Sequence, residues 1–152
     1  MGLDHLLAMI AVGMWAAQLG GRATWLVPMG FVSLMATSAW LASFSAGLPL
    51  LELGIASSVL LLGLLVAFAA RLSVSVSVSL VGLFAFFHGF AHGLEFPETA
   101  SPMLYGIGFM MATAMLHGIG MGLGISTRRI HLLSRLAGSM IALTGVYLLA
   151  NA

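Results

Sequence analysis

The sequence predicts an all-α protein, a polytopic membrane helix bundle with six transmembrane helices that form a single domain over residues 1–152. Hydrophobic residues make up 61% of the chain and charged residues only 6%, whereas a soluble domain carries about 25% charged residues. The apolar residues gather in six long runs separated by short polar or Gly/Pro segments. So few ionic groups cannot cover a surface in water, and we therefore expect the surrounding medium to be a lipid bilayer.

Each apolar run is long enough to cross a bilayer, which takes about 20 helical residues, with a range of about 17–25. We expect helices at residues 3–19, 24–45, 50–70, 74–94, 102–125 and 131–150. Residues 73–80 alternate like a strand. We predict a helix there nevertheless, because an isolated strand in lipid leaves its backbone groups unpaired. Glycine pairs such as Gly118/Gly122 and Gly120/Gly124 indicate close helix packing.

The basic residues are distributed unevenly between the loops. Those in or beside the first, third and fifth loops are Arg22, Arg71, Arg128, Arg129 and Arg135. Odd-numbered loops of a six-helix bundle share one side, which the positive-inside rule makes cytoplasmic. We therefore predict that both termini lie outside, and that Glu95 and Glu98 lie in an outer loop. The formal net charge of +1 indicates no nucleic-acid partner.

The strongest local motif lies at the end of the fourth predicted helix. His88, His92 and Glu95 are spaced i, i+4 and i+7, so their side chains share one helical stripe. Ionisable groups within a bilayer are costly and usually have a partner or a function. Two imidazoles one turn apart are able to bind one divalent ion, with the carboxylate assisting.

Further polar residues fall at the same depth. Asp4 and His5 lie at the outer end of the first helix, where Asp4 is also a plausible helix cap, and Glu52 begins the third. We expect the outer ends of helices one, three and four to bring together Asp4, His5, Glu52, His88, His92 and Glu95. His117 lies deeper and is either an inner station on an ion path or a histidine bonded across the bundle.

The types of ligand restrict the metal. Imidazole and carboxylate in a chain with no cysteine suit nickel, cobalt or zinc better than calcium or magnesium. The methionines of the fifth helix raise copper(I) as a rival, although methionine is also ordinary packing material. Those residues are Met103, Met110, Met111, Met115 and Met121. Metal binds neutral imidazole, so capture should weaken as the pH falls through the histidine range.

These segments resemble the HupE/UreJ family of membrane proteins, over essentially the whole chain. The resemblance rests on Gly2–Met9, Phe87–Glu95 and Ala112–His117, together with Glu52. It implies a nickel or cobalt permease that serves hydrogenase or urease maturation. The maturation proteins of these enzymes are candidate partners. The family motif His-Pro-x-x-Gly-x-Asp-His is matched from its glycine onward by Gly2, Asp4 and His5. Its leading His-Pro would precede Met1, so the sequence looks N-terminally short.

With this resemblance, the sequence is interpreted as a permease of a bacterial cytoplasmic (inner) membrane for a divalent transition metal. Nickel is favoured, and no cofactor beyond the transported ion is expected. One alternative is an electron-transfer subunit in which His88 or His92 ligates haem together with His117. Another is an accessory membrane protein that holds metal without transporting it. An enzyme is not expected, because the sequence has neither a nucleophilic-serine turn motif nor a His-Glu-x-x-His pattern.

Overall fold

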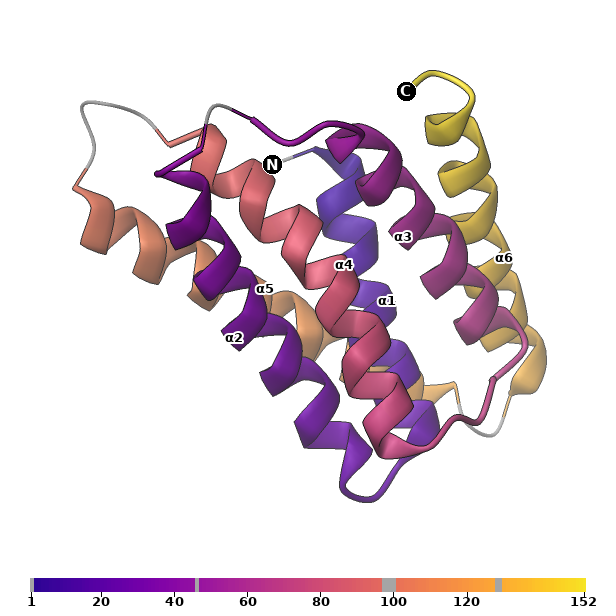
Figure 1. Ribbon diagram of the computed structural model, residues 1–152. Coiled ribbons are helices and arrows are strands. Elements are labelled where there is room, and N and C mark those ends of the chain that lie inside the picture. Colours follow the sequence, from indigo (N-terminus) through magenta and orange to yellow (C-terminus); the bar gives the residue numbers. More distant parts are fainter. Residues whose placement is uncertain (1, 46, 97–100, 128–129) are drawn as a thin grey trace.

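The computed structural model describes residues 2–45, 47–96, 101–127 and 130–152, and this part of the chain contains six helices and no strand (Figure 1). The helices are α1 Leu3–Leu19, α2 Ala23–Ala42, α3 Leu51–Ala67, α4 Val74–Leu94, α5 Pro102–Ser126 and α6 His131–Leu149. The expected residues Glu98, Arg128 and Arg129 lie outside the described ranges. The predicted all-helical fold is thus confirmed.

The strand-like serine repeat is helical, as predicted. α4 begins at Val74, and the side chain of Ser73 accepts a hydrogen bond from the Val76 amide as its N-terminal cap. The cap satisfies one of the amide groups that have no partner within the helix. The long apolar run that follows, and not the short alternation, therefore determines the local structure.

Two helices end earlier than expected. α3 stops at Ala67 because Ala69 adopts a left-handed φ of 47°, and the Ala70 amide then donates back to the Leu65 carbonyl. This is a Schellman-type helix end, usually built on glycine. α2 stops at Ala42, after which the chain continues in tight turns. Neither end carries the glycine or proline that signals a stop in a sequence.

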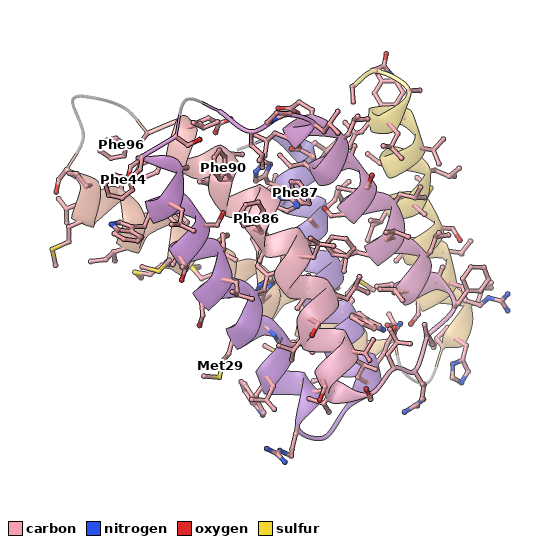
Figure 2. All side chains as sticks on the ribbon, in the orientation of Figure 1. Met29, Phe44, Phe86, Phe87, Phe90 and Phe96 are labelled. Carbon is pink, nitrogen blue, oxygen red and sulfur yellow. The ribbon has the colours of Figure 1, made fainter. Side chains whose placement is uncertain are left out.

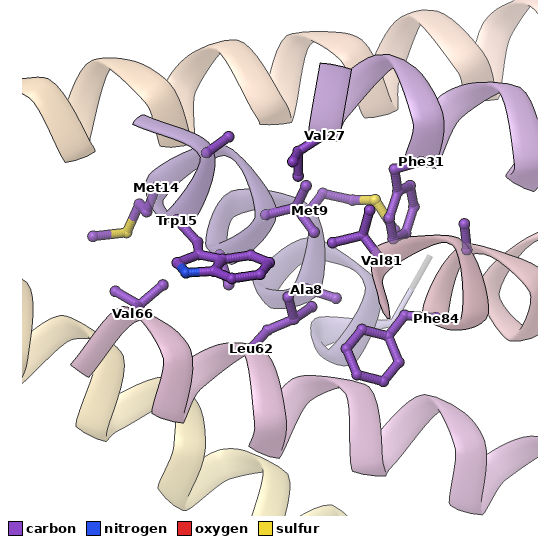
Figure 3. Close-up of a cluster of buried hydrophobic side chains, with 14 of the residues drawn as sticks. Ala8, Met9, Met14, Trp15, Val27, Phe31, Leu62, Val66, Val81 and Phe84 are labelled. Atoms are coloured by element: carbon purple, nitrogen blue, oxygen red, sulfur yellow. The ribbon is translucent and has the colours of Figure 1, made fainter. Parts of the chain in front are cut away.

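The bundle is built from three closely packed helix pairs, α2 with α4, α3 with α6 and α1 with α5. α1 also contacts α2, α3 and α6, which makes it the central helix. Figure 3 shows Ala8, Met9 and Trp15 of α1 between side chains of α2 and α3. The core therefore lies around α1, and the N-terminal residues of α1 are held between neighbouring helices.

Glycines make the closest helix approaches. A Cβ at Gly89 would overlap the Met35 backbone of α2, and one at Gly120 would overlap the Ile10 backbone of α1. Gly63 is similarly closed off by α6. Of the glycine pairs expected to pack, Gly120 and Gly124 do so, whereas Gly118 and Gly122 face open space.

The outer surface is apolar. Large hydrophobic side chains project from the outer faces of the helices, as Figure 2 shows for Met29 of α2. Among the described residues, α2, α4, α5 and α6 are long and apolar enough to span a membrane, while α1 and α3 have 17 residues each and fall short of that length criterion. The six predicted spans are thus matched by six helices, four of which meet the criterion.

The two ends of the bundle differ in their charges. Helices α1, α3 and α5 end, and α2, α4 and α6 begin, toward the lower end in Figure 1, and both termini lie at the upper end. Arg22 precedes α2, Arg71 precedes α4, and Arg135 lies in the first turns of α6. These three arginines therefore share one end, as the loop count predicts.

Candidate metal centre

Three imidazoles meet in the interior near the N-terminus of α1. The ring centroid of His5 lies 4.6 Å from that of His88 and 5.0 Å from that of His92, in edge-to-face arrangements. The exposed fractions are 5% for His5, 0% for His88 and 3% for His92. The i, i+4 spacing on α4 directs both of its histidines toward α1, while Gly89 and Gly93 face α2. We call His5, His88 and His92 the imidazole cluster.

Asp4 orients His5. The Asp4 carboxylate accepts hydrogen bonds from the His5 backbone amide at 2.8 Å and from the His5 ring Nδ1 at 3.1 Å. Because a carboxylate accepts hydrogen bonds, the ring proton is assigned to Nδ1. The other nitrogen, Nε2, is buried and has no hydrogen-bond partner. Asp4 is therefore best interpreted as an orienting residue for His5.

Ser58 of α3 plays the same part for His88. Its hydroxyl donates to the Ile55 carbonyl at 2.6 Å and lies 2.8 Å from His88 Nε2. The single hydroxyl proton is used toward Ile55, so the serine oxygen accepts from an Nε2–H of His88. His88 Nδ1 then carries the lone pair, and it too is buried without a partner.

His117 of α5 lies apart from the imidazole cluster and is oriented by the backbone. Its Nδ1 lies 2.8 Å from the Met9 carbonyl, which only accepts, so Nδ1 carries the proton. Nε2 is buried and unpartnered. The fully buried ring of Phe31 contacts both His117 and His88. Its centroid lies 5.2 Å from that of the His117 ring and 5.9 Å from that of the His88 ring.

His92 borders a cavity. Its ring stacks on Phe109 of α5 at 5.0 Å, and its Nε2 is buried without a partner. The cavity beside it has a volume of about 540 Å³ and is lined by aromatic side chains that include Trp40 and Tyr105. A second cavity, of about 360 Å³, borders His117 between α2 and α5.

The predicted carboxylate ligands are not all brought together. Glu52 and Glu95 both lie on exposed positions, and Glu95 falls just beyond the last residue of α4. Within the described ranges, no three His, Asp or Glu side chains stand ready to hold one ion as they are placed. The side chains of the imidazole cluster would have to rotate to admit a metal, and Glu52 and Glu95 remain predicted ligands.

Sequence reasoning missed three residues of this region. Ser58 and Phe31 contact the histidines from other helices, and Phe109 stacks on His92. None of them carries a local motif, because their roles arise from helix packing. Of the five methionines that raise copper(I) as a rival, Met103, Met111 and Met115 are exposed, whereas Met110 and Met121 line the cavities beside His92 and His117.

A lipid-compatible helical bundle with buried, oriented imidazoles defines an integral membrane protein with a candidate metal centre. The family model described as HupE / UreJ protein matches residues 1–148. Protein HupE of Rhizobium leguminosarum bv. viciae is 44% identical over 152 residues, which cover 99% of this chain and 80% of that protein. No solved structure matches the chain. The chain belongs to the HupE/UreJ family.

Proposed function

We propose that this protein is a permease for a divalent transition-metal ion, with nickel favoured over cobalt, and that it supplies hydrogenase or urease maturation. Membership of the HupE/UreJ family supports the metal and its use. The ion is the cargo, so the site must bind it and also release it.

The observation that carries this proposal is the state of the ring nitrogens. His5, His88 and His117 each donate one N–H to an oxygen and keep the other nitrogen buried and free. A buried polar atom without a partner is costly. Metal-binding histidines characteristically use this arrangement, in which an acceptor fixes the tautomer and leaves a lone pair for the metal.

The cavities suggest a route for the ion. The cavity beside His92 includes Trp40, Ser43 and Phe96, near the end of α2 and the end of α4. The cavity beside His117 includes Trp25, near the start of α2 and thus toward the arginine-bearing end. The buried Phe31 ring contacts both His88 and His117. We propose capture at the imidazole cluster, passage at Phe31 and relay through His117.

We propose that all six helices span the cytoplasmic membrane of a bacterial cell, with both termini outside. A 17-residue helix is about 25 Å long, close to the hydrocarbon thickness of about 30 Å. α1 is surrounded by other helices, so its shorter apolar length does not expose polar backbone to lipid. The arginines at one end support a cytoplasmic assignment for that end.

The haem alternative is less compatible with the packing. A haem ligated by His88 and His117 would require space between their rings, but the buried Phe31 side chain contacts both. Phe109 likewise occupies the face of His92. A small ion needs only the free nitrogens, so the geometry favours metal-ion transport.

The test is nickel uptake by proteoliposomes that contain the full chain. We expect His88→Ala and His92→Ala to abolish uptake at unchanged expression, because each removes a free ring nitrogen. Ser77→Ala is the matched control, since Ser77 is a buried side chain of the same helix and its hydroxyl makes no hydrogen bond in the described structure. Unchanged accumulation in the histidine variants would refute the assignment, and binding without flux would indicate a metal-holding accessory protein.

A further inference from the structure

A cavity of about 760 Å³ lies at the arginine-bearing end of the bundle, away from the imidazole cluster. It is formed where α1 and α3 end and α6 begins, and its polar wall includes Gln18, Arg71, His131 and Arg135. It is larger than the cavities beside His92 and His117. Nothing in the proposed transport route uses it.

The charges of this cavity are uncompensated. Within the described part of the chain, neither Arg71 nor Arg135 makes a hydrogen bond or an ion pair. The described carboxylates belong to the opposite end, at the starts of α1 and α3 and the end of α4. Two guanidinium groups beside one cavity favour a phosphate group, whose oxygens accept their N–H groups in pairs.

The remaining wall is apolar. Leu19, Val66 and Phe68 line the cavity, and the Phe68 side chain is 71% exposed. A ligand with only ionic groups would leave this apolar wall facing water or empty space. A ligand that has both a phosphate group and hydrocarbon would match both walls. Basic pockets between membrane helices at the cytoplasmic side bind lipid headgroups in this way.

We propose that this cavity is a binding site for an anionic phospholipid, with Arg71 and Arg135 holding the phosphate and the apolar wall receiving the start of the acyl chains. The Gln18 side chain donates to the Val66 carbonyl at 3.1 Å and keeps a buried, unpartnered Oε1. This hydrogen bond fixes the Gln18 side chain in the wall of the cavity beside the two arginines. Phosphatidylglycerol, which carries one negative charge on its phosphate group, is a suitable probe.

The test is retention of phosphatidylglycerol by the purified full chain in detergent, measured by native mass spectrometry, with phosphatidylcholine as the zwitterionic comparison. We expect selective retention of phosphatidylglycerol. The double variant Arg71→Gln/Arg135→Gln should bind it about 30-fold more weakly. Arg22→Gln is the matched control, because Arg22 directly precedes α2 at the same end but does not line the cavity.

Inorganic phosphate distinguishes the two sources of a phosphate group. Retention that survives excess inorganic phosphate supports the lipid, whereas tight phosphate binding without lipid preference overturns the lipid assignment. Equal retention by the double variant and the wild type, or an equal loss in Arg22→Gln, also overturns it. If the double variant does not purify with wild-type helicity by circular dichroism, the two single variants are compared with Arg22→Gln in the same assay.

Discussion

The buried histidines differ in what holds them. His5 is oriented by a carboxylate, His88 by a serine hydroxyl and His117 by a backbone carbonyl. Each partner leaves the opposite ring nitrogen free. Loss of such an orienting group typically lowers metal affinity by about 10- to 100-fold. Residues that never touch the ion should therefore affect its binding.

Ser58→Ala tests this dependence. The substitution removes the acceptor for His88 Nε2–H while preserving the helix, so the ring loses its fixed tautomer. We expect nickel affinity to fall by about 10- to 100-fold, as measured by equilibrium binding to the detergent-purified protein. The control Ser77→Ala, also a buried serine, should bind nickel like the wild type. Equal affinities in both variants would show that Ser58 does not orient His88 for metal.

Phe31→Leu tests the passage between the imidazole cluster and His117. Phe31 is the buried ring in contact with both His88 and His117. A smaller, non-aromatic side chain should therefore leave a wider passage between these two histidines. We expect faster nickel flux and a proton leak, measured by a pH-sensitive dye in proteoliposomes. Phe84→Leu removes a similarly buried ring that makes no described imidazole contact, and it should not leak. The same leak in both variants would point to general loosening.

The histidines of the centre could be predicted from the sequence, but their surroundings could not. The spacing of His88 and His92 is visible in one helix, and the structure places His5 beside them. Ser58 and Phe31 have no local signature, because only the packing of α2 and α3 brings them to the rings. Glu95 shares the stripe of an ideal helix, but α4 ends at Leu94 and the Glu95 side chain is exposed.

Helix pairs in this bundle come together at glycines. Burying apolar surface between helices gives little free energy in a bilayer, because the lipid is itself apolar. Close backbone contact therefore contributes more to helix association. Gly13 and Gly120 serve the α1–α5 pair, Gly89 the α2–α4 pair, and Gly138 the α3–α6 pair. The α1–α5 contact also positions the Met9 carbonyl against His117.

Gly120→Ala and Gly118→Ala form a matched pair on one helix. A Cβ at Gly120 would overlap the Ile10 carbonyl and lie 3.1 Å from Gly13 Cα, whereas at Gly118 it meets nothing within 4 Å. We expect Gly120→Ala to cost roughly 1–3 kcal/mol of unfolding free energy. Gly118→Ala should be neutral or gain about 0.5–1 kcal/mol, since alanine favours helix. Denaturant unfolding in mixed micelles, followed by circular dichroism, measures both, and equal effects would contradict the packing.

The helices themselves follow closely from the sequence. Long apolar runs and the polar segments between them locate all six, because backbone hydrogen bonds in lipid have to be satisfied within a helix. The ends are less predictable. Ala69 takes a left-handed conformation that sequence rules reserve for glycine, and it shortens α3 relative to the predicted range. The choice of glycines that pack also depends on helix rotation, which a single sequence does not reveal.

The arrangement of the bundle places its buried imidazoles and its arginines toward opposite ends. The imidazole cluster lies near the end that carries both termini, and the arginines gather at the other end. In the proposed function, this polarity provides the entrance and the exit of the transported ion. It also gives the cavity beside Arg71 a position at the proposed cytoplasmic surface.

The orientation of the bundle is testable because the chain contains no cysteine. Single cysteines at Ser45 and Asn151 should react in intact cells with a membrane-impermeant maleimide, since both positions lie at the proposed outer end. A cysteine at Leu72, in the α3–α4 connection, should react only after the cells are opened. The reverse pattern would place the arginine-bearing loops outside and would invert the proposed direction of uptake.

The most direct measurement is X-ray absorption spectroscopy of the purified protein loaded with nickel. The proposed site predicts nickel bound by imidazole nitrogen, with a ring-scattering signal that disappears in the His88→Ala/His92→Ala double variant. Nickel surrounded only by oxygen, or an unchanged spectrum in the double variant, would contradict the assignment of these histidines to the transported ion.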